Sequence, residues 1–249
     1  MLVRKLGQFF FIYCLGLTFL FGLKYALGLS NYVLPDIALL FSTAGQVVKE
    51  YVTAVFSTLA VTVLGQFISI ALAFAVGIAG RKSSWLGSLI RAAAYSIQSY
   101  PIVALAPIIF ILLGDGFLSR LLIASMICYF PLLLSVLGIM TAPVEDIEHF
   151  YHATGQMNWR LEVKIRAFEN LSKLSTVISG SASLALAGTI VAEFIAADAG
   201  IGYSIRTALY QSDMAKILTA LFLIGIVITV YQGLLETIGA RITQIWSGT

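Results

Sequence analysis

The chain has 249 residues, of which 59% are hydrophobic and 11% charged, and its net charge is +3. An average soluble domain is about 45–50% apolar and about 25% charged. A mean hydropathy of +0.96 excludes an ordinary soluble fold, because a soluble core of this size cannot enclose so much hydrocarbon. The weak net charge and the thinly spread basic residues give no support for nucleic acid as a partner.

Six charge-free runs are long enough to cross a bilayer, which takes about 20 mostly apolar residues in a helix. Ionisable groups are poorly tolerated there, so the runs predict six transmembrane helices with short connections. Their residues do not alternate between polar and apolar, which excludes a transmembrane β-barrel. The predicted fold is an all-α, polytopic membrane protein. The runs lie between Lys5 and Lys24, Glu50 and Arg81, Arg91 and Asp115, Arg120 and Glu145, Lys173 and Glu193, and Lys216 and Glu236.

The N-terminal part, residues 1–49, is predicted to hold the first transmembrane helix and an external segment. Two basic residues precede 9-FFFIYCLGLTFLFGL-23, as in a signal peptide, but no Ala-x-Ala-like cleavage site follows. An uncleaved helix is therefore the simpler interpretation. Residues 37–48 are uncharged but too short to cross, and they are expected to form an interfacial or re-entrant helix. Residues 50–249 are expected to form the core.

The positive charges predict the orientation in the membrane. With the N-terminus in the cytoplasm, ten basic residues fall inside and five outside, and cytoplasmic loops carry the excess of Lys and Arg. Both termini are therefore expected in the cytoplasm. The inside set is Arg4, Lys5, Arg81, Lys82, Arg91, Arg160, Lys164, Arg166, Lys173 and Arg241, and the outside set is Lys24, Lys49, Arg120, Arg206 and Lys216.

Glycines and prolines interrupt the predicted spans. Glycines within spans are expected to permit close packing of helices. Pro101, Pro107 and Pro131 are expected to kink their helices, either as hinges for alternating access or as simple irregularities. The glycines are Gly65, Gly77, Gly138, Gly188 and Gly225.

The one sizeable polar segment is the loop of residues 143–173, between the fourth and fifth spans. A first short helix is predicted up to Gly155, because glycine suits the residue after a helix end. A second helix is predicted after Asn158, a good N-cap. The loop is either a hairpin on the membrane surface or a docking surface, and its length favours docking. In the first helix the expected apolar face is Ile147, Phe150, Tyr151 and Thr154 and the polar face Glu145, Asp146, Glu148, His149 and His152; in the second the apolar face is Leu161, Ile165 and Phe168.

This loop resembles the cytoplasmic coupling loop of permease subunits in binding-protein-dependent ABC importers. The motif of that family runs Glu-Ala-Ala, three residues, Gly, then a hydrophobic position and a Leu-Pro pair further on. In this chain the Glu-Ala-Ala positions are His149, Phe150 and Tyr151, and Phe168 and Ser172 stand where prolines are usual. The matching positions are Gly155, Trp159, Ile165 and Leu171.

The end of the fifth span carries a more specific resemblance. Residues 192-AEFIAADAGIGY-203 look very like the same region of permeases for taurine, alkanesulfonates, nitrate and thiamine precursors. The resemblance covers residues 50 to 248. The positions that carry it are Glu193, Gly200, Gly202 and Tyr203, with Thr58, Leu59, Pro101, Ala104, Pro107, Gly114, Phe130, Pro131, Trp246 and Gly248 as further landmarks.

The resemblance implies a permease subunit of a bacterial inner membrane, surrounded by lipid, with no catalytic residue or cofactor of its own. ATP and Mg²⁺ would be bound by separate ATP-binding subunits, and a second permease subunit would complete the pore. An extracytoplasmic solute-binding protein would deliver a small organic molecule or anion, such as a sulfonate, nitrate or a thiamine precursor. The implied coupling residues are His149, Phe150, Tyr151, Gly155 and Trp159, and the implied gating or translocation residues are Pro101, Pro107, Pro131 and Glu193.

Other functions have weaker support in the sequence. In 77-GIAGRKSS-84 the two glycines of a phosphate-binding loop would have to fall at Val76 and Arg81, so no nucleotide site is expected in this chain. His149 and His152 could share a metal, but no cysteine or third histidine is near them. An ion-coupled secondary carrier would depend on Glu193 as a proton relay. The favoured alternative is that Glu193 caps a helix or forms a pair near the outer interface.

Overall fold

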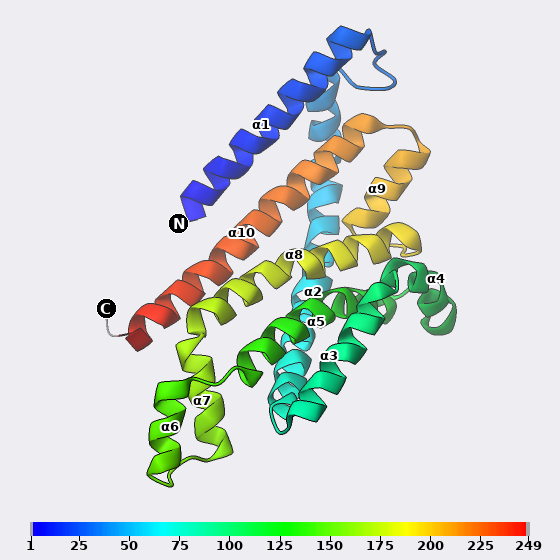
Figure 1. The fold of residues 1–249 in the computed structure, drawn as a ribbon. Coiled ribbons are helices and arrows are strands. Elements are labelled where there is room, and N and C mark those ends of the chain that lie inside the picture. Colours follow the sequence, from blue (N-terminus) through cyan, green and yellow to red (C-terminus); the bar gives the residue numbers. More distant parts are fainter. Residues whose placement is uncertain (1, 248–249) are drawn as a thin grey trace.

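The computed structural model describes residues 2–247, and these residues form ten helices and no strand (Figure 1). The predicted all-α fold is thus confirmed. The helices are α1 (Leu2–Leu27), α2 (Ile37–Gly80), α3 (Ser84–Ser99), α4 (Ile102–Leu113), α5 (Phe117–Thr141), α6 (Glu145–Ala153), α7 (Trp159–Glu169), α8 (Leu171–Ile195), α9 (Ile201–Tyr210) and α10 (Met214–Ser247).

Five helices, α1, α2, α5, α8 and α10, are long and apolar enough to cross a membrane. A sixth span results if α3 and α4 are counted together, although they meet at an angle of 84°. The candidate spans therefore follow one another along the chain in the order that the charge-free runs predicted. The third span differs from expectation. It consists of two helices that meet at a sharp angle, and the first of them begins at Ser84, before the charge-free run that follows Arg91.

Proline accounts for the bend in the third span. Tyr100 has extended backbone (φ −76°, ψ 135°), as steric contact with a following proline requires. The break at Pro101 is larger than the expected kink. Pro107 and Pro131 lie inside α4 and α5 without ending either helix.

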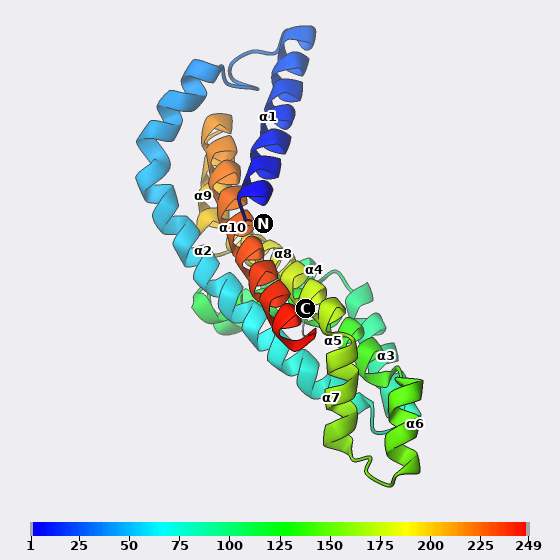
Figure 2. The ribbon, with the colours of Figure 1, turned by 90° about the vertical axis from the view of Figure 1, so that its left-hand side faces the viewer.

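The segment 37–48 is not the separate interfacial helix that was expected. It forms the first turns of α2, which continues for 44 residues, about 66 Å at about 1.5 Å per residue. No proline lies within α2, and Val47, Tyr51 and Val55 are buried against Ala220 and Ile224. This burial holds the helix together across the expected boundary at residues 49 and 50, and α2 runs as one long bow along the bundle (Figure 2).

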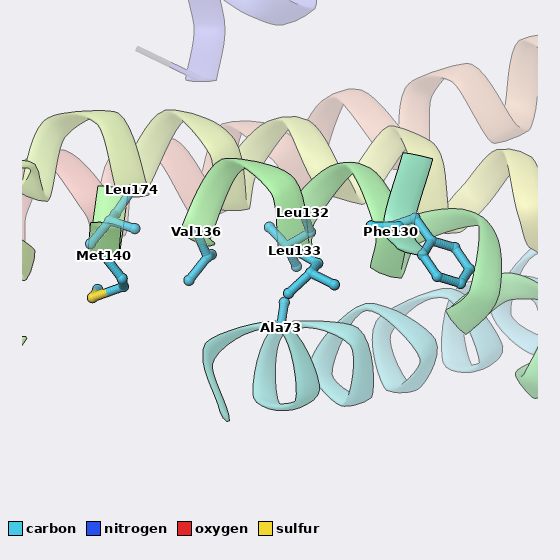
Figure 3. Close-up of a cluster of buried hydrophobic side chains, with 8 residues drawn as sticks. Ala73, Phe130, Leu132, Leu133, Val136, Met140 and Leu174 are labelled. Atoms are coloured by element: carbon cyan, nitrogen blue, oxygen red, sulfur yellow. The ribbon is translucent and has the colours of Figure 1, made fainter. Parts of the chain in front are cut away.

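The centre of the bundle is the contact of α2 with α5. Ala73 on α2 faces Leu133 on α5 within a buried cluster that also contains Phe130 and Val136 (Figure 3). Gly65, Gly77, Gly188 and Gly225 lie in close packing contacts as expected, since an added Cβ would lie 3.2, 2.8, 2.9 and 2.5 Å from Ala124, Val136, Ala124 and Phe9. Gly138 was wrongly assigned to this group, because a Cβ there would meet nothing within 4 Å.

Helix α1 packs along α10 at one side of the bundle (Figure 1). Phe9, Phe10 and Tyr13 surround Phe222, with ring centroids 4.8 to 6.0 Å apart. The buried Lys24 bonds to Asp36 and, at 2.6 Å, to Asn31, which fixes the connection from α1 to α2. Asn31 and Tyr32 of this connection border the same cavity as Gln211 and Ser212 between α9 and α10. These two connections lie at the end of the molecule opposite α6 and α7 (Figure 1).

Candidate functional site

Helices α6 and α7 form a hairpin that extends beyond the bundle (Figures 1 and 2). Gly155, the second residue after α6, has φ +67°, a conformation that glycine adopts without strain. The Asn158 side chain accepts hydrogen bonds from the amides of Arg160 (3.1 Å) and Leu161 (3.0 Å). The predicted end of the first helix and the predicted cap of the second are therefore confirmed.

Arg166 ties the hairpin to the bundle. Its Nε and Nη2 donate to the two carboxylate oxygens of Glu148 at 2.7 and 2.9 Å, and Nη2 also lies 3.0 Å from Glu162. Its Nη1 donates to the carbonyl of Met140 at the end of α5. Both Glu148 and Arg166 are buried, with exposed fractions of 6% and 8%. The hydrogen bonds from Arg166 lower the pKa of Glu148 below its ordinary value of 4.5, because they stabilise the ionised carboxylate.

The predicted faces of α6 are partly wrong. Glu148 was placed on the solvated face, but its bidentate pairing with Arg166 buries it. Phe150, two residues further on, must then point in nearly the opposite direction, and it is 61% exposed. His149 and Gly155 are exposed and Tyr151 is half-buried. The ion pair has overridden the apolar pattern that the sequence suggested.

The hairpin therefore presents aromatic side chains to the outside. Trp159, at the first turn of α7, is 56% exposed and lies 5.5 Å from the Arg81 guanidinium and 5.4 Å from that of Arg160. The rings of Phe150 and Tyr151 are 5.5 Å apart. Phe168, expected on the buried face of α7, is 45% exposed and packs against Trp246 instead.

Glu193 lies near the end of α8 and is completely buried. Its Oε2 accepts from the Gly202 amide at 3.0 Å and from the Thr58 hydroxyl at 2.8 Å. Its Oε1 is 3.5 Å from Arg120 Nη1. The Thr58 hydroxyl in turn accepts from the Ile201 amide at 2.8 Å. One carboxylate thus joins α2, α5, α8 and the first turn of α9.

Two glycines allow α9 to approach this carboxylate. A Cβ on Gly200, which has φ +99°, would overlap the Glu193 carboxylate itself. A Cβ on Gly202 would lie 2.6 Å from the Ile190 carbonyl oxygen and 2.7 Å from Glu193 Cβ. The resemblance in 192–203 therefore has a physical basis in this contact.

The cluster brings together Glu193 and Thr58, which the sequence had marked separately, but it does not include the three prolines. Arg120 was missed as the partner of Glu193, although a buried acid in a span calls for a nearby cation. A polar row on α2 was also missed. It includes Thr62 bonded to Thr189 at 3.1 Å and Gln66 bonded to Ser181 at 2.9 Å.

The family model described as "Binding-protein-dependent transport system inner membrane component" matches residues 69–244. The chain is 33% identical over 161 residues to the riboflavin transport system permease protein RibX of Chloroflexus aurantiacus. The aligned segment covers 63% of this chain and 60% of that protein. The chain is 22% identical over 200 residues to the formylaminopyrimidine transport permease protein ThiX of Halalkalibacterium halodurans, 78% of each.

The matched region begins within α2, after Thr58, includes the hairpin together with Arg120, Glu193 and Gly202 of the cluster, and ends in α10. It covers well over half of the chain, and its multi-pass helical fold agrees with the family description. We conclude that the chain belongs to the family of inner membrane components of binding-protein-dependent transport systems.

Proposed function

We propose that this chain is the permease subunit of an ABC importer and that its hairpin docks on a separate ATP-binding subunit. The observation that supports docking is the exposure of Phe150 and Trp159 on a hairpin that Arg166 bonds to Glu148 and to the end of α5. Buried aromatic side chains are typical energetic centres of protein interfaces. Both rings belong to the one hairpin and are available for such an interface.

The Arg166 contacts also suggest a route for coupling. Movement of the hairpin would be transmitted through Arg166 to Glu148 within the hairpin and to the Met140 carbonyl on α5. Helix α5 packs extensively on α2 and α8, so displacement of the hairpin would tilt the central helices. With a second permease subunit completing the pore, such a tilt would change the side from which the cavity is open.

Substitution of Phe150 tests the docking proposal. Phe150→Ala should weaken capture of the ATP-binding subunit by roughly 30-fold, because truncation of a buried aromatic anchor commonly costs about 2 kcal/mol or more. Phe168→Ala is the matched control, since Phe168 lies on the same hairpin but against Trp246. Pull-down of the subunit by each purified variant measures the effect. Equal capture by wild-type and Phe150→Ala permease would favour the surface-hairpin interpretation.

For the solute we propose a flat nitrogen heterocycle of the flavin or pyrimidine type. The support is that the two relatives are named for riboflavin and for a formylaminopyrimidine. A sulfonate or nitrate, the other solutes suggested by the sequence resemblance, is the competing proposal. The contacts of Glu193 give little support to a secondary carrier, because its carboxylate is already engaged by Thr58, Gly202 and Arg120.

Reconstitution tests this proposal. The permease is placed in proteoliposomes with its ATP-binding subunit and solute-binding protein, and uptake of riboflavin, a formylaminopyrimidine and taurine is compared. We expect ATP-dependent uptake of a heterocycle that is insensitive to an uncoupler. Uptake of taurine alone would overturn the solute proposal but leave the permease proposal intact. Uptake driven by a proton gradient in the absence of the ATP-binding subunit would overturn the permease proposal, whichever solute is taken up.

A further inference from the structure

A cavity of about 420 Å³ lies at the base of the hairpin, between the α2–α3 turn, the end of α5 and α7. Its wall contains three arginines, Arg81, Arg91 and Arg166, and a single acid, Glu162. The volume falls in the range of small-molecule sites, about 300–1,000 Å³. A cavity of this size and charge suits a small anionic group.

The arginines are not fully neutralised by the protein. Arg166 is shared between Glu148 and Glu162, and Arg81 also pairs with Glu162. Arg91 bonds only weakly to the Thr141 hydroxyl, at 3.4 Å, and has no acidic partner within residues 2–247. One full positive charge in the wall is therefore free to meet a ligand.

Arg81 supplies a second, independent feature. Its side chain is only 7% exposed, yet its Nε has no hydrogen-bond partner among the described residues. The Nε atom itself is closed to the cavity, so Arg81 contributes to the wall through the positive charge of its guanidinium, which it shares with Glu162.

The start of α3 provides further donors. Ser83 caps the helix by accepting from the Leu86 amide at 3.1 Å, and the exposed Ser84 and Ser88 line the cavity. The positive end of this 16-residue helix dipole favours an anion at the same place.

The surroundings of the cavity indicate where the anion comes from. On α3, next to the cavity, Trp85 is 72% and Leu89 50% exposed. Tryptophan is enriched at membrane–water interfaces, and basic pockets between transmembrane helices bind anionic lipid headgroups. We propose that this cavity binds the phosphate group of an anionic phospholipid in the leaflet that faces the hairpin, with its acyl chains along α3. This site goes beyond the proposed transport function and does not depend on the identity of the solute.

Lipid binding to the full chain in detergent tests this site. Phosphatidylglycerol and phosphatidylcholine are titrated, and retention is measured by native mass spectrometry. Arg91→Gln should weaken phosphatidylglycerol binding about tenfold through loss of a charge-assisted bond, and Arg91→Lys should retain most of it. Lys82→Gln is the matched control, because Lys82 is an exposed neighbour that does not line the cavity. It should change binding by less than about twofold.

The arms of the experiment separate the possible sources of the anion. Binding of inorganic phosphate that depends on Arg91, without preference for phosphatidylglycerol, would overturn the lipid assignment in favour of a soluble phosphate. Equal losses in Arg91→Gln and Lys82→Gln would overturn the site, because the attraction would then be general surface charge. If the ATP-binding subunit displaces the lipid and Arg91→Gln weakens subunit capture instead, the cavity belongs to a protein contact and the proposal fails. None of these readouts requires transport.

Discussion

At the scale of single residues, the contacts of Glu193 explain how its carboxylate can lie inside an apolar helix bundle. Its charge is met by Arg120, and its oxygens accept from Thr58 and the Gly202 amide. The sequence marked Thr58 and Gly202 only through a resemblance, and Glu193 also as an acid at the end of a charge-free run. It did not reveal Arg120 as the fourth member, because that contact joins α5 to α8 and depends on how the helices pack.

Removal of the carboxylate should be more harmful than removal of the whole pair. Glu193→Ala leaves a buried Arg120 without its counter-charge, and breaking a buried pair in this way costs about 3–5 kcal/mol. The double variant Glu193→Leu with Arg120→Met should recover much of this loss, because no uncompensated charge remains. Thermal unfolding in detergent measures both, with the exposed Glu50→Ala as a control that should stay near wild-type stability. A double variant no more stable than Glu193→Ala would contradict the pairing.

The glycine next to this cluster allows a second test. Gly202→Ala places a Cβ 2.6 Å from a backbone carbonyl oxygen, and such overpacking costs about 1–3 kcal/mol. Gly180→Ala in α8 is the matched control, since a Cβ there meets nothing within 4 Å and alanine is the better helix former. The unfolding midpoint should fall for the first and hold or rise for the second. Equal midpoints would show that α9 does not approach α8 this closely.

At the scale of elements, the hairpin shows which structural features can be predicted from local sequence and which cannot. The end of α6 near Gly155 and the cap of α7 at Asn158 were predicted, because both depend on the residue itself and its immediate neighbours. The buried side of α6 was not predicted, because it depends on Arg166 in α7. The apolar pattern pointed to Phe150, and a bidentate ion pair placed Glu148 there instead.

This ion pair makes the hairpin sensitive to acid. The pKa of Glu148 is lowered by hydrogen bonds from Arg166, so its stabilisation is complete above the ordinary value of 4.5 and is lost as the pH falls through the lower folded-state value. With Trp85→Phe and Trp246→Phe, Trp159 fluorescence reports on the hairpin alone. We expect its emission to change only below about pH 4.5, and Glu148→Gln to show the altered emission already at neutral pH. A transition unchanged in Glu148→Gln would assign it to another acid.

At the scale of the whole molecule, the distribution of charge predicted the order of the spans, and also their number if α3 and α4 are counted as one span. Charged residues are costly and rare in the hydrocarbon, so this signal depends little on tertiary structure. The two differences arise where packing or a single proline decides. Burial of Tyr51 extends α2 well beyond its charge-free run, and Pro101 divides the third span.

The same charge pattern predicts the topology, and the structure supplies three well-exposed reporter positions. Tyr32, in the connection from α1 to α2, is 73% exposed, and Tyr210, at the end of α9, is 81% exposed. The α1–α2 connection and the α9–α10 connection border one cavity. Arg160 lies on the hairpin at the opposite end (Figure 1). With Cys14→Ser and Cys128→Ser as background, a membrane-impermeant maleimide should label Tyr32→Cys and Tyr210→Cys from outside intact cells.

Arg160→Cys should be labelled only in inverted vesicles, because ten of the fifteen basic residues lie on the predicted cytoplasmic side. Lysis with detergent, which exposes all three positions, is the control for reactivity. Labelling of Arg160→Cys from outside would place the hairpin away from any cytoplasmic ATP-binding subunit, and Phe150 could then have no role in coupling. Labelling of Tyr32→Cys and Tyr210→Cys from opposite sides would instead contradict the shared cavity and the path of α1 across the membrane.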